Sequence, residues 1–196
     1  MGDVMNKISP IDTVTIRPGR KTDARHLAVL VNYAGDGLPH YFWTKAADGG
    51  FAWTIGEQRA MREHGSYSYR NALIAELNGE VVGMIIFYPI AEKASAEAYA
   101  EMSPIIVPLQ ELEDMAVGTT YVNVLAVYPA HRGKGIGSRL LDHAANTCAE
   151  MSIIVTDINV GARKLYERKG FVAKAERPII KEDWDGRGET FILMTK

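Results

Sequence analysis

The stretch over residues 124–141 constrains the fold of this 196-residue chain more than any other. Residues 124–127 are apolar and predict a strand, and residues 136–141 have the periodicity of an amphipathic helix. Between them, three glycines alternate with other residues: Gly133, Gly135 and Gly137. Glycines leave backbone N–H groups uncovered, and the first N–H groups of a helix have no partner within it. The stretch therefore predicts a cradle for an anion such as a diphosphate, to which Arg132 and Lys134 add positive charge.

Spacing separates the classes of loop that bind phosphate in this way. A P-loop needs a lysine followed by serine or threonine, whereas Lys134 is followed by Gly135. A dinucleotide fingerprint needs Gly-x-Gly-x-x-Gly, and Gly137 falls one position too early, although Asp157 lies at a suitable distance for the acidic residue. The third pattern, Arg/Gln-x-x-Gly-x-Gly/Ala, is satisfied at every position from Arg132 onward. A plain glycine-rich turn between strand and helix is the alternative.

A second motif spans residues 159–171. Asn159 is a good N-cap and Gly170 is a typical C-terminal stop, so the residues between them predict a helix. Three of its side chains fall on one face: Ala162, Leu165 and Tyr166. By itself this pattern is that of an ordinary amphipathic helix.

Together, the two motifs resemble motifs A and B of the GNAT superfamily of N-acetyltransferases. Motif A is Arg132-x-x-Gly135-x-Gly137, and motif B runs from Asn159 to Phe171 as Asn-x-x-Ala-x-x-Leu-Tyr-x-x-x-Gly-Phe. The resemblance is specific over roughly residues 119–177. It implies an α/β fold with a mixed, mostly antiparallel central sheet flanked by helices on both faces. In that fold the central strand and its successor splay apart, and the acyl-CoA arm lies in the gap.

The resemblance also implies which residues bind acetyl-CoA, here a co-substrate that needs no metal. The pyrophosphate would lie on the loop that ends the central strand: Arg132, Gly133, Lys134, Gly135, Ile136, Gly137 and Ser138. The exposed backbone of the strand would pair with the pantetheine arm: Leu125, Ala126 and Val127. The N–H of Val127 would stabilise the oxyanion that forms during acyl transfer.

The second motif would complete the donor site. By resemblance, Asn159 and Ala162 contact CoA, and Tyr166 binds CoA and protonates the leaving thiolate. A tyrosine with an ordinary pKa near 10 is protonated at pH 7 and can donate. A purely packed Tyr166 and a purely capping Asn159 are the alternatives.

The general base is where this chain departs from the family pattern. Many GNAT enzymes carry a glutamate on the central strand at the position of Asn123. An amide cannot accept a proton, so the expected role of Asn123 at the reacting centre is to orient water or the acceptor. Upstream, Glu111, Glu113 and Asp114 are substitutes, although solvated surface charge is the favoured interpretation. Water-mediated deprotonation is the remaining route.

Composition excludes several other classes of protein. Hydrophobic residues make up 47% of the chain and charged residues 23%, as in globular domains. The net charge of −2 argues against nucleic-acid and anionic-membrane partners. No apolar run approaches the ~18 residues of a membrane span. The five histidines lack metal-ligand spacing, and the single cysteine, Cys148, indicates the cytoplasm. Cys148 extends an apolar helical stripe that runs from Ile136 to Met151, so a core position is expected.

The chain is expected to form a single domain over residues 13–196, preceded by a flexible lead-in over residues 1–12. Asn78-Gly79 is a strong hairpin signal between two strands. Strands are expected over 14–18, 71–77, 80–88, 119–127, 152–156, 171–177 and 190–195. Helices are expected over 23–33, capped by Thr22; over 38–44; over 54–64, opened by a capping box at Thr54; and in the two motifs.

Residues 91–118 form a helical insertion broken by Pro104 and Pro108. We expect it to cover the acceptor cleft, with a homodimer contact as the alternative. Four aromatic residues lie where this fold builds its acceptor wall, although a core role is more common: Tyr33, Tyr41, Phe42 and Trp43.

The sequence therefore predicts an N-acetyltransferase that moves an acetyl group to a primary amine by direct attack in a ternary complex. A non-catalytic acyl-CoA-binding sensor or interaction module is the main alternative, since the strand glutamate is missing. A nucleotide-binding oxidoreductase is the third. Charge and composition do not select the acceptor.

Overall fold

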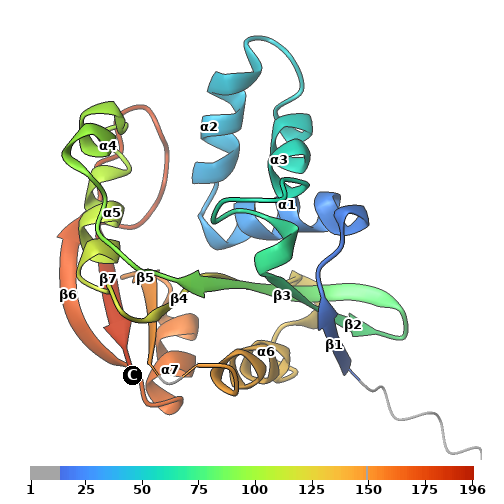
Figure 1. The fold of residues 1–196 in the computed structure, drawn as a ribbon. Coiled ribbons are helices and arrows are strands. Elements are labelled where there is room, and N and C mark those ends of the chain that lie inside the picture. The colour runs from blue at the N-terminus through green and yellow to red at the C-terminus, as the bar shows by residue number, and fades with distance from the viewer. Residues whose placement is uncertain (1–13, 149) are drawn as a thin grey trace, which may run out of the picture.

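The computed structural model describes residues 14–148 and 150–196, so the predicted lead-in over residues 1–12 lies outside the described residues. One sheet organises the chain, with strand order β1-β2-β3-β4-β5-β7-β6 (Figure 1). The strands are β1 (Val14–Pro18), β2 (Ala72–Leu77), β3 (Glu80–Pro89), β4 (Thr120–Val127), β5 (Met151–Thr156), β6 (Val172–Pro178) and β7 (Thr190–Thr195). The helices are α1 (Ala24–Ala34), α2 (Leu38–Ala47), α3 (Ala52–Ala60), α4 (Ala96–Glu101), α5 (Val107–Asp114), α6 (Ile136–Ala145) and α7 (Val160–Arg168).

Helices cover both faces of the sheet, and the predicted fold class is confirmed. Among the described strands, only β4 and β5 run parallel; every other neighbouring pair is antiparallel. Helices α6 and α7 lie on one face, and α1 to α3 with α4 and α5 lie on the other (Figure 1). Leu140 and Leu141 of α6 are fully buried on the first face, and Leu27 and Leu30 of α1 are fully buried on the second.

Strands β4 and β5 separate soon after they meet. Among the described residues, their pairing is limited to Thr120–Met151, Tyr121–Ser152 and Val122–Ile153. Beyond Ile153, strand β5 pairs with β7 instead, and β4 pairs with β3. The sheet is therefore open between the second half of β4 and the end of β5.

A β-bulge at Asn123 changes which side chains face each side of the sheet. Ile86 of β3 pairs with Val124, and the next residue, Phe87, pairs with Val122, so Asn123 is the extra residue. Before the bulge, Val122 packs in the core under α6; after it, Val124 packs in the core under α1. The bulge thus reverses the alternation of β4 at the point where the strand leaves β5.

The predicted insertion over residues 91–118 is folded back onto the sheet. It forms α4 and α5, and α5 packs on β6 and β7. Ile105 and Leu112 are fully buried beside Leu193 of β7. Pro104 lies in the turn between α4 and α5, where a break was expected. Pro108 instead lies in the first turn of α5, where proline is tolerated, so the expected break at Pro108 is wrong.

Three sequence predictions about helix ends are wrong. Helix α1 begins at Ala24 after a 3-10 turn, and its N-cap is Asp23 rather than the expected Thr22. The buried Asp23 side chain accepts a hydrogen bond from the Arg20 backbone N–H (2.7 Å). Helix α3 begins at Ala52 and ends at Ala60, because tertiary packing of Gly56 against the Trp43 ring outweighs the local capping signal at Thr54.

The helix of motif A is also shorter than its apolar stripe suggests. Helix α6 ends at Ala145, and Met151 begins β5. Cys148 is half-buried beside the same core, and its thiol donates to the Ala144 carbonyl at 3.4 Å.

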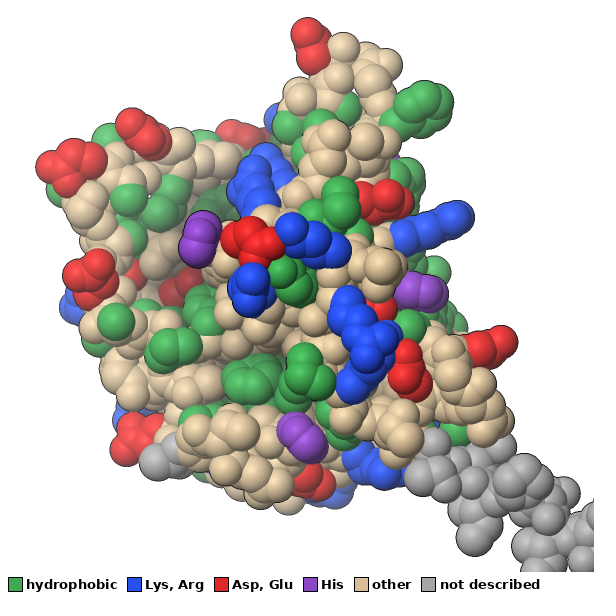
Figure 2. Space-filling view, turned by 45° about the vertical axis from the view of Figure 1, so that its right-hand side comes forward, with side chains coloured by type: hydrophobic (Ala, Val, Ile, Leu, Met, Phe, Trp, Pro, Cys, Tyr) green, Lys and Arg blue, Asp and Glu red, His purple; other side chains and the backbone are tan. Residues whose placement is uncertain are grey.

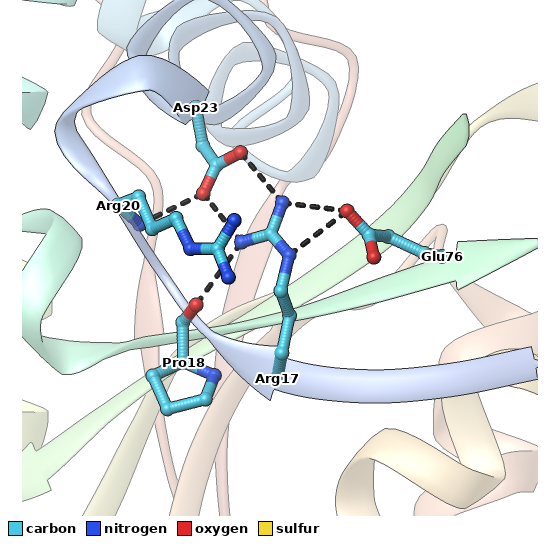
Figure 3. Close-up of polar contacts among 5 residues, drawn as sticks. All are labelled: Arg17, Pro18, Arg20, Asp23 and Glu76. Carbon is cyan, nitrogen blue, oxygen red and sulfur yellow. Dashed lines mark hydrogen bonds and ion pairs between the residues drawn. The ribbon is translucent and has the colours of Figure 1, made fainter. Parts of the chain in front are cut away.

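At the N-terminal corner, one arginine joins three segments (Figure 3). The Arg17 guanidinium of β1 contacts Asp23 through Nη1 (2.8 Å) and Nη2 (2.9 Å) and Glu76 of β2 through Nε (2.8 Å). Elsewhere on the surface, basic and acidic side chains are interspersed on the face drawn in Figure 2. Among the described residues, no helix is long and apolar enough to cross a membrane.

Candidate functional site

The glycine loop of motif A leads directly into helix α6. Gly133 (φ 75°) and Gly135 (φ 78°) are in the left-handed region, where side chains with a Cβ are strained. Gly135 is the N-cap of α6, and a Cβ at Gly137 would meet Leu165 at 3.6 Å. In the described structure, the first turn of α6 carries no acidic side chain. The positive end of the helix dipole is therefore available to an anion.

This loop forms one wall of a cleft of about 950 Å³. The cleft lies where β4 and β5 separate, and it includes most of the predicted donor residues. It is lined by Tyr33, Ala34, Asp36, Leu125, Ala126, Val127, His131, Arg132, Gly133, Gly135, Ile136, Gly137, Ser138, Thr156, Ile158, Asn159, Gly161, Ala162, Leu165, Arg168 and Arg187. Lys134 and Tyr166, which the sequence also assigns to CoA, are not among these lining residues.

Strand β4 turns alternate backbone groups toward the cleft. The N–H of Tyr128 donates to Val82 of β3 (2.9 Å), so the preceding Val127 turns its backbone away from β3. Consistently, the Val127 carbonyl accepts a hydrogen bond from Arg132 Nε (3.0 Å) on the other side. By the same alternation Leu125 faces the cleft, whereas the backbone of Ala126 faces β3.

Three arginines border the cleft, and sequence reasoning found one of them. Arg132 is tied to the end of β4 by its bond to Val127. Arg168 lies at the end of α7, and Arg187 pairs with Asp36 at 2.8 Å. Sequence reasoning missed Arg168 and Arg187 because they lie 36 and 55 residues after Arg132 in the chain, and only the fold brings them to the cleft.

Motif B forms helix α7 with the predicted cap. The Asn159 side chain accepts a hydrogen bond from the Ala162 N–H at 3.3 Å, and Gly170 (φ 89°) ends the helix. Asn159, Ala162 and Leu165 line the cleft. Tyr166, one residue further round the helix, faces a different space.

That space is a second cavity of about 260 Å³. It adjoins the cleft, because both are lined by Ala34, Leu125, Thr156 and Asn159. The second cavity is lined further by Gly35, Leu38, Pro39, Phe42, Ile106, Leu109, Glu113, Tyr121, Asn123, Ile154, Val155, Tyr166, Trp184 and Phe191. The bulge residue Asn123 and the predicted acid Tyr166 therefore share one cavity.

Burial sets the protonation of the groups in this cavity. Burial raises the pKa of Tyr166 well above its ordinary value. Burial also raises the pKa of Glu113 to about 7, partly offset by its polar contact with Tyr121. Tyr121 in turn contacts Asn123, and its own pKa is raised by burial.

The three acids of the insertion have different environments. Glu111 is paired with Arg177 of β6. Asp114 accepts hydrogen bonds from the Ala94 N–H (3.0 Å), the Tyr99 hydroxyl (2.9 Å) and the Gln110 amide (2.9 Å). Glu113 alone of the three lines the second cavity. The expectation of solvated charge is therefore wrong for this residue, because its orientation depends on the packing of α5.

The four aromatic residues that were candidates for the acceptor wall lie in different places. Phe42 lines the second cavity and Tyr33 lines the cleft. Trp43 is 2% exposed in the core beneath α1, and Tyr41 contacts Asp183 of the β6–β7 loop. No cluster of potential metal ligands occurs in the described ranges.

The open α/β sheet, the cleft between the parting strands and the glycine loop form a site whose geometry suits a phosphate-bearing ligand, and a second cavity adjoins it. The model of the Acetyltransferase (GNAT) family matches residues 38–171. This chain therefore belongs to the GNAT acetyltransferase family. Among curated proteins, none matches the chain.

Solved structures share the fold at low sequence identity. An N-acetyltransferase from Staphylococcus aureus Mu50 is 20% identical with a TM-score of 0.66, covering 93% of this chain and 100% of its own. A GNAT family acetyltransferase from Elizabethkingia anophelis with acetyl-CoA bound is 17% identical (TM-score 0.55; 94% and 98% covered). Arabidopsis thaliana Naa50, in complex with the bisubstrate analogue CoA-Ac-MVNAL, is 19% identical (TM-score 0.54; 95% and 99% covered).

Proposed function

We propose that this protein is an N-acetyltransferase that transfers the acetyl group of acetyl-CoA to a primary amine by direct attack in a ternary complex. The observation that carries the proposal is the junction of the two cavities at Leu125, Thr156 and Asn159. A donor in the cleft and an acceptor in the second cavity would meet there without a covalent enzyme intermediate.

The residues of the cleft fit a CoA donor. The left-handed glycines and the start of α6 present N–H groups to a pyrophosphate, and Arg132 and Arg168 add positive charge, whereas Arg187 is paired with Asp36. The backbone of Leu125 and the N–H of Val127 suit the amides of a pantetheine arm, whereas the Val127 carbonyl is bonded to Arg132 and Ala126 contributes only its side chain. When bound, acetyl-CoA supplies an activated thioester.

Two further groups support transfer at the junction. The Val127 N–H faces the cleft and would stabilise negative charge on the thioester oxygen. Tyr166 stays protonated at neutral pH because burial raises its pKa, so it can donate a proton to the leaving sulfur. Asn123 would orient the acceptor nitrogen or a water by hydrogen bonding.

The donor half of the proposal is tested at Gly135. Gly135→Val places a branched side chain at a left-handed position in the cradle, so CoA binding should weaken at least tenfold, or ~1.4 kcal/mol. Gly79→Val is the matched control, because Gly79 (φ 84°) is equally left-handed but lies in the β2–β3 turn. Isothermal titration calorimetry with CoA measures both variants, and equal affinity of folded Gly135→Val and wild type would contradict the assignment.

A non-catalytic acyl-CoA-binding module remains the second candidate, favoured by Asn123 in place of a strand base. Release of free CoA thiol from acetyl-CoA on incubation with mixed amines separates the two. The low cysteine content supports the cytoplasm as the site of action. A homodimer stays a prediction, which sedimentation or light scattering would test.

A further inference from the structure

We propose that the second cavity binds an acceptor with one ammonium group on an apolar body, and that Glu113 binds this ammonium and takes its proton. The inference rests on the proposed acetyltransfer and adds the acceptor class and the base. Neither follows from the family pattern, because the usual strand position holds Asn123.

The walls of the second cavity select the acceptor. The apolar part of the lining includes Leu38, Pro39, Phe42, Ile106, Leu109 and Phe191. The uncharged polar part consists of Tyr121, Asn123, Thr156, Asn159 and Tyr166. Of the described residues that line the cavity, Glu113 is the one that carries a formal charge. One carboxylate can neutralise one ammonium, whereas a second ammonium or a carboxylate on the acceptor would be desolvated without an oppositely charged partner among the described lining residues. The lining therefore favours a monoamine over a polyamine or a free amino acid.

The position of Glu113 gives it access to the reacting nitrogen. It projects from α5 into the cavity that also contains Asn123 and Tyr166, and Tyr121 contacts both Glu113 and Asn123. Its neighbours on α5, Glu111 and Asp114, are held by Arg177 and by three hydrogen-bond donors, so they are not available.

The groups around Glu113 are neutral or acidic. Tyr121 on β4 and Tyr88 on β3 interact with it, Tyr166 on α7 lines the same cavity, and Asp114 on α5 itself adds negative charge. With burial, these surroundings hold the pKa of Glu113 near 7, where the carboxylate both exists at neutral pH and accepts a proton readily.

The proposed step balances as follows. The acceptor ammonium gives one proton to Glu113, and the nitrogen lone pair then forms a C–N bond to the thioester carbonyl carbon. The C–S bond breaks, its electron pair remains on sulfur, and sulfur takes a proton from Tyr166. The second nitrogen proton re-protonates the Tyr166 oxygen through the cavity, and Glu113 releases its proton to solvent. The products are an N-acetyl amine, CoA thiol and one proton.

The acceptor class is tested with matched amines. Isoamylamine and 2-phenylethylamine carry the same apolar bodies as leucine and phenylalanine but lack the carboxylate. With acetyl-CoA saturating, kcat/KM for the two monoamines should exceed that for leucine, phenylalanine and spermidine at least tenfold. Preference for spermidine, for a free amino acid or for a leucyl peptide would overturn the acceptor class while leaving acetyltransfer intact.

The base is tested with Glu113→Gln, and Glu111→Gln on the same helix is the control. At pH 7, kcat/KM for the preferred amine should fall roughly 10²-fold in Glu113→Gln and stay near wild type in the control. The wild-type profile should rise to about pH 7 and level off, whereas that of Glu113→Gln should rise further to the pKa of the free amine.

Two readouts besides turnover complete the test. Calorimetry should show unchanged CoA affinity in both variants, and ¹³C NMR of the glutamate carboxyl carbons should show a titration near pH 7 that Glu113→Gln removes. An unchanged rate and profile in Glu113→Gln would overturn the role of Glu113. If CoA binds but no amine is acetylated, the proposed function fails together with the inference.

Discussion

At the scale of single residues, burial rather than ion pairing sets the chemistry of the second cavity. Tyr166 and Glu113 face the same space, and burial raises the pKa of each. The raised pKa keeps Tyr166 protonated at neutral pH, as a general acid requires. For the glutamate, it strengthens a base that would otherwise be weak at neutral pH.

Removing the Tyr166 hydroxyl should separate catalysis from binding. Tyr166→Phe keeps the buried ring, so CoA affinity should change little, but turnover should fall roughly 10²-fold because the leaving sulfur loses its proton donor. Tyr67→Phe is a suitable control, since that hydroxyl donates to the Gly56 carbonyl (3.2 Å) outside both cavities. Thiol-release kinetics and calorimetry measure the two effects. Equal turnover in Tyr166→Phe and wild type would reduce Tyr166 to a packing residue.

The raised pKa of Glu113 should also appear in thermal stability. A glutamate whose folded pKa, about 7, exceeds its ordinary value of 4.5 destabilises the folded state increasingly as pH rises between these values. Because glutamine does not ionise, Glu113→Gln should raise Tm relative to wild type at pH 8 and not at pH 4. Scanning calorimetry across this range measures the difference, and a constant Tm offset would show that the two pKa values are equal.

At the scale of elements, helix α5 connects stability to the acceptor cavity. Its Leu112 is fully buried against β6 and β7, whereas Leu109, three residues earlier, lines the second cavity. Replacing residues 94–116 by a flexible linker would therefore remove part of the core as well as a wall of the cavity. Point substitutions on α5 distinguish the two roles.

The two leucines of α5 should respond differently to truncation. Leu112→Ala should lower the free energy of unfolding by about 3 kcal/mol, since it leaves a void in a closed core. Leu109→Ala should cost less stability and raise the acceptor KM several-fold, with CoA affinity unchanged. Chemical denaturation and steady-state kinetics measure these effects. A monomeric Leu109→Ala variant of a dimeric wild type, with intact acceptor kinetics, would favour the dimer contact instead of the cover.

Several elements encoded by short-range signals could be predicted from sequence, whereas the caps expected at Thr22 and Thr54 and the features decided by packing could not. The hairpin at Asn78-Gly79, the glycine loop before α6 and the Asn159 cap depend on a few adjacent residues, and all are present. The bulge at Asn123 has no local signature, because it arises from the register of two strands. The orientation of Glu113 into the cavity likewise depends on how α5 packs on β6 and β7.

At the scale of the whole molecule, long-range contacts hold the ends of the sheet to its helices. Arg17 joins β1, the start of α1 and β2 through Asp23 and Glu76 (Figure 3). Asp23 is 4% exposed. Burial raises the pKa of Asp23. Hydrogen bonds from Arg17 and from the Arg20 N–H together lower this pKa by more than burial raises it, so the pKa lies below the ordinary value.

This contact should make stability depend on acid pH. Because the pKa of Asp23 is lowered in the folded state, its contribution is complete above the ordinary value of 3.8 and is lost as pH falls through the lowered pKa. Asp23→Asn should lower the free energy of unfolding by roughly 3 kcal/mol at pH 7, since it leaves the Arg17 charge partly unpaired. The difference should shrink near pH 2. Urea denaturation at both pH values measures it, and a pH-independent difference would contradict the ionic origin.

The early separation of β4 from β5 has a mechanical consequence. In the described strands, β4 and β5 share three residue pairs, fewer than any other neighbouring pair of strands, so we expect the sheet to flex most easily at this seam. A ligand that spans the cleft would touch both halves, since Val127 and Thr156 belong to opposite sides of the seam. Binding of the donor would then hold the two halves together, and slower hydrogen exchange at Thr120 and Val122, whose backbone faces β5, would show that the seam stiffens around its ligand.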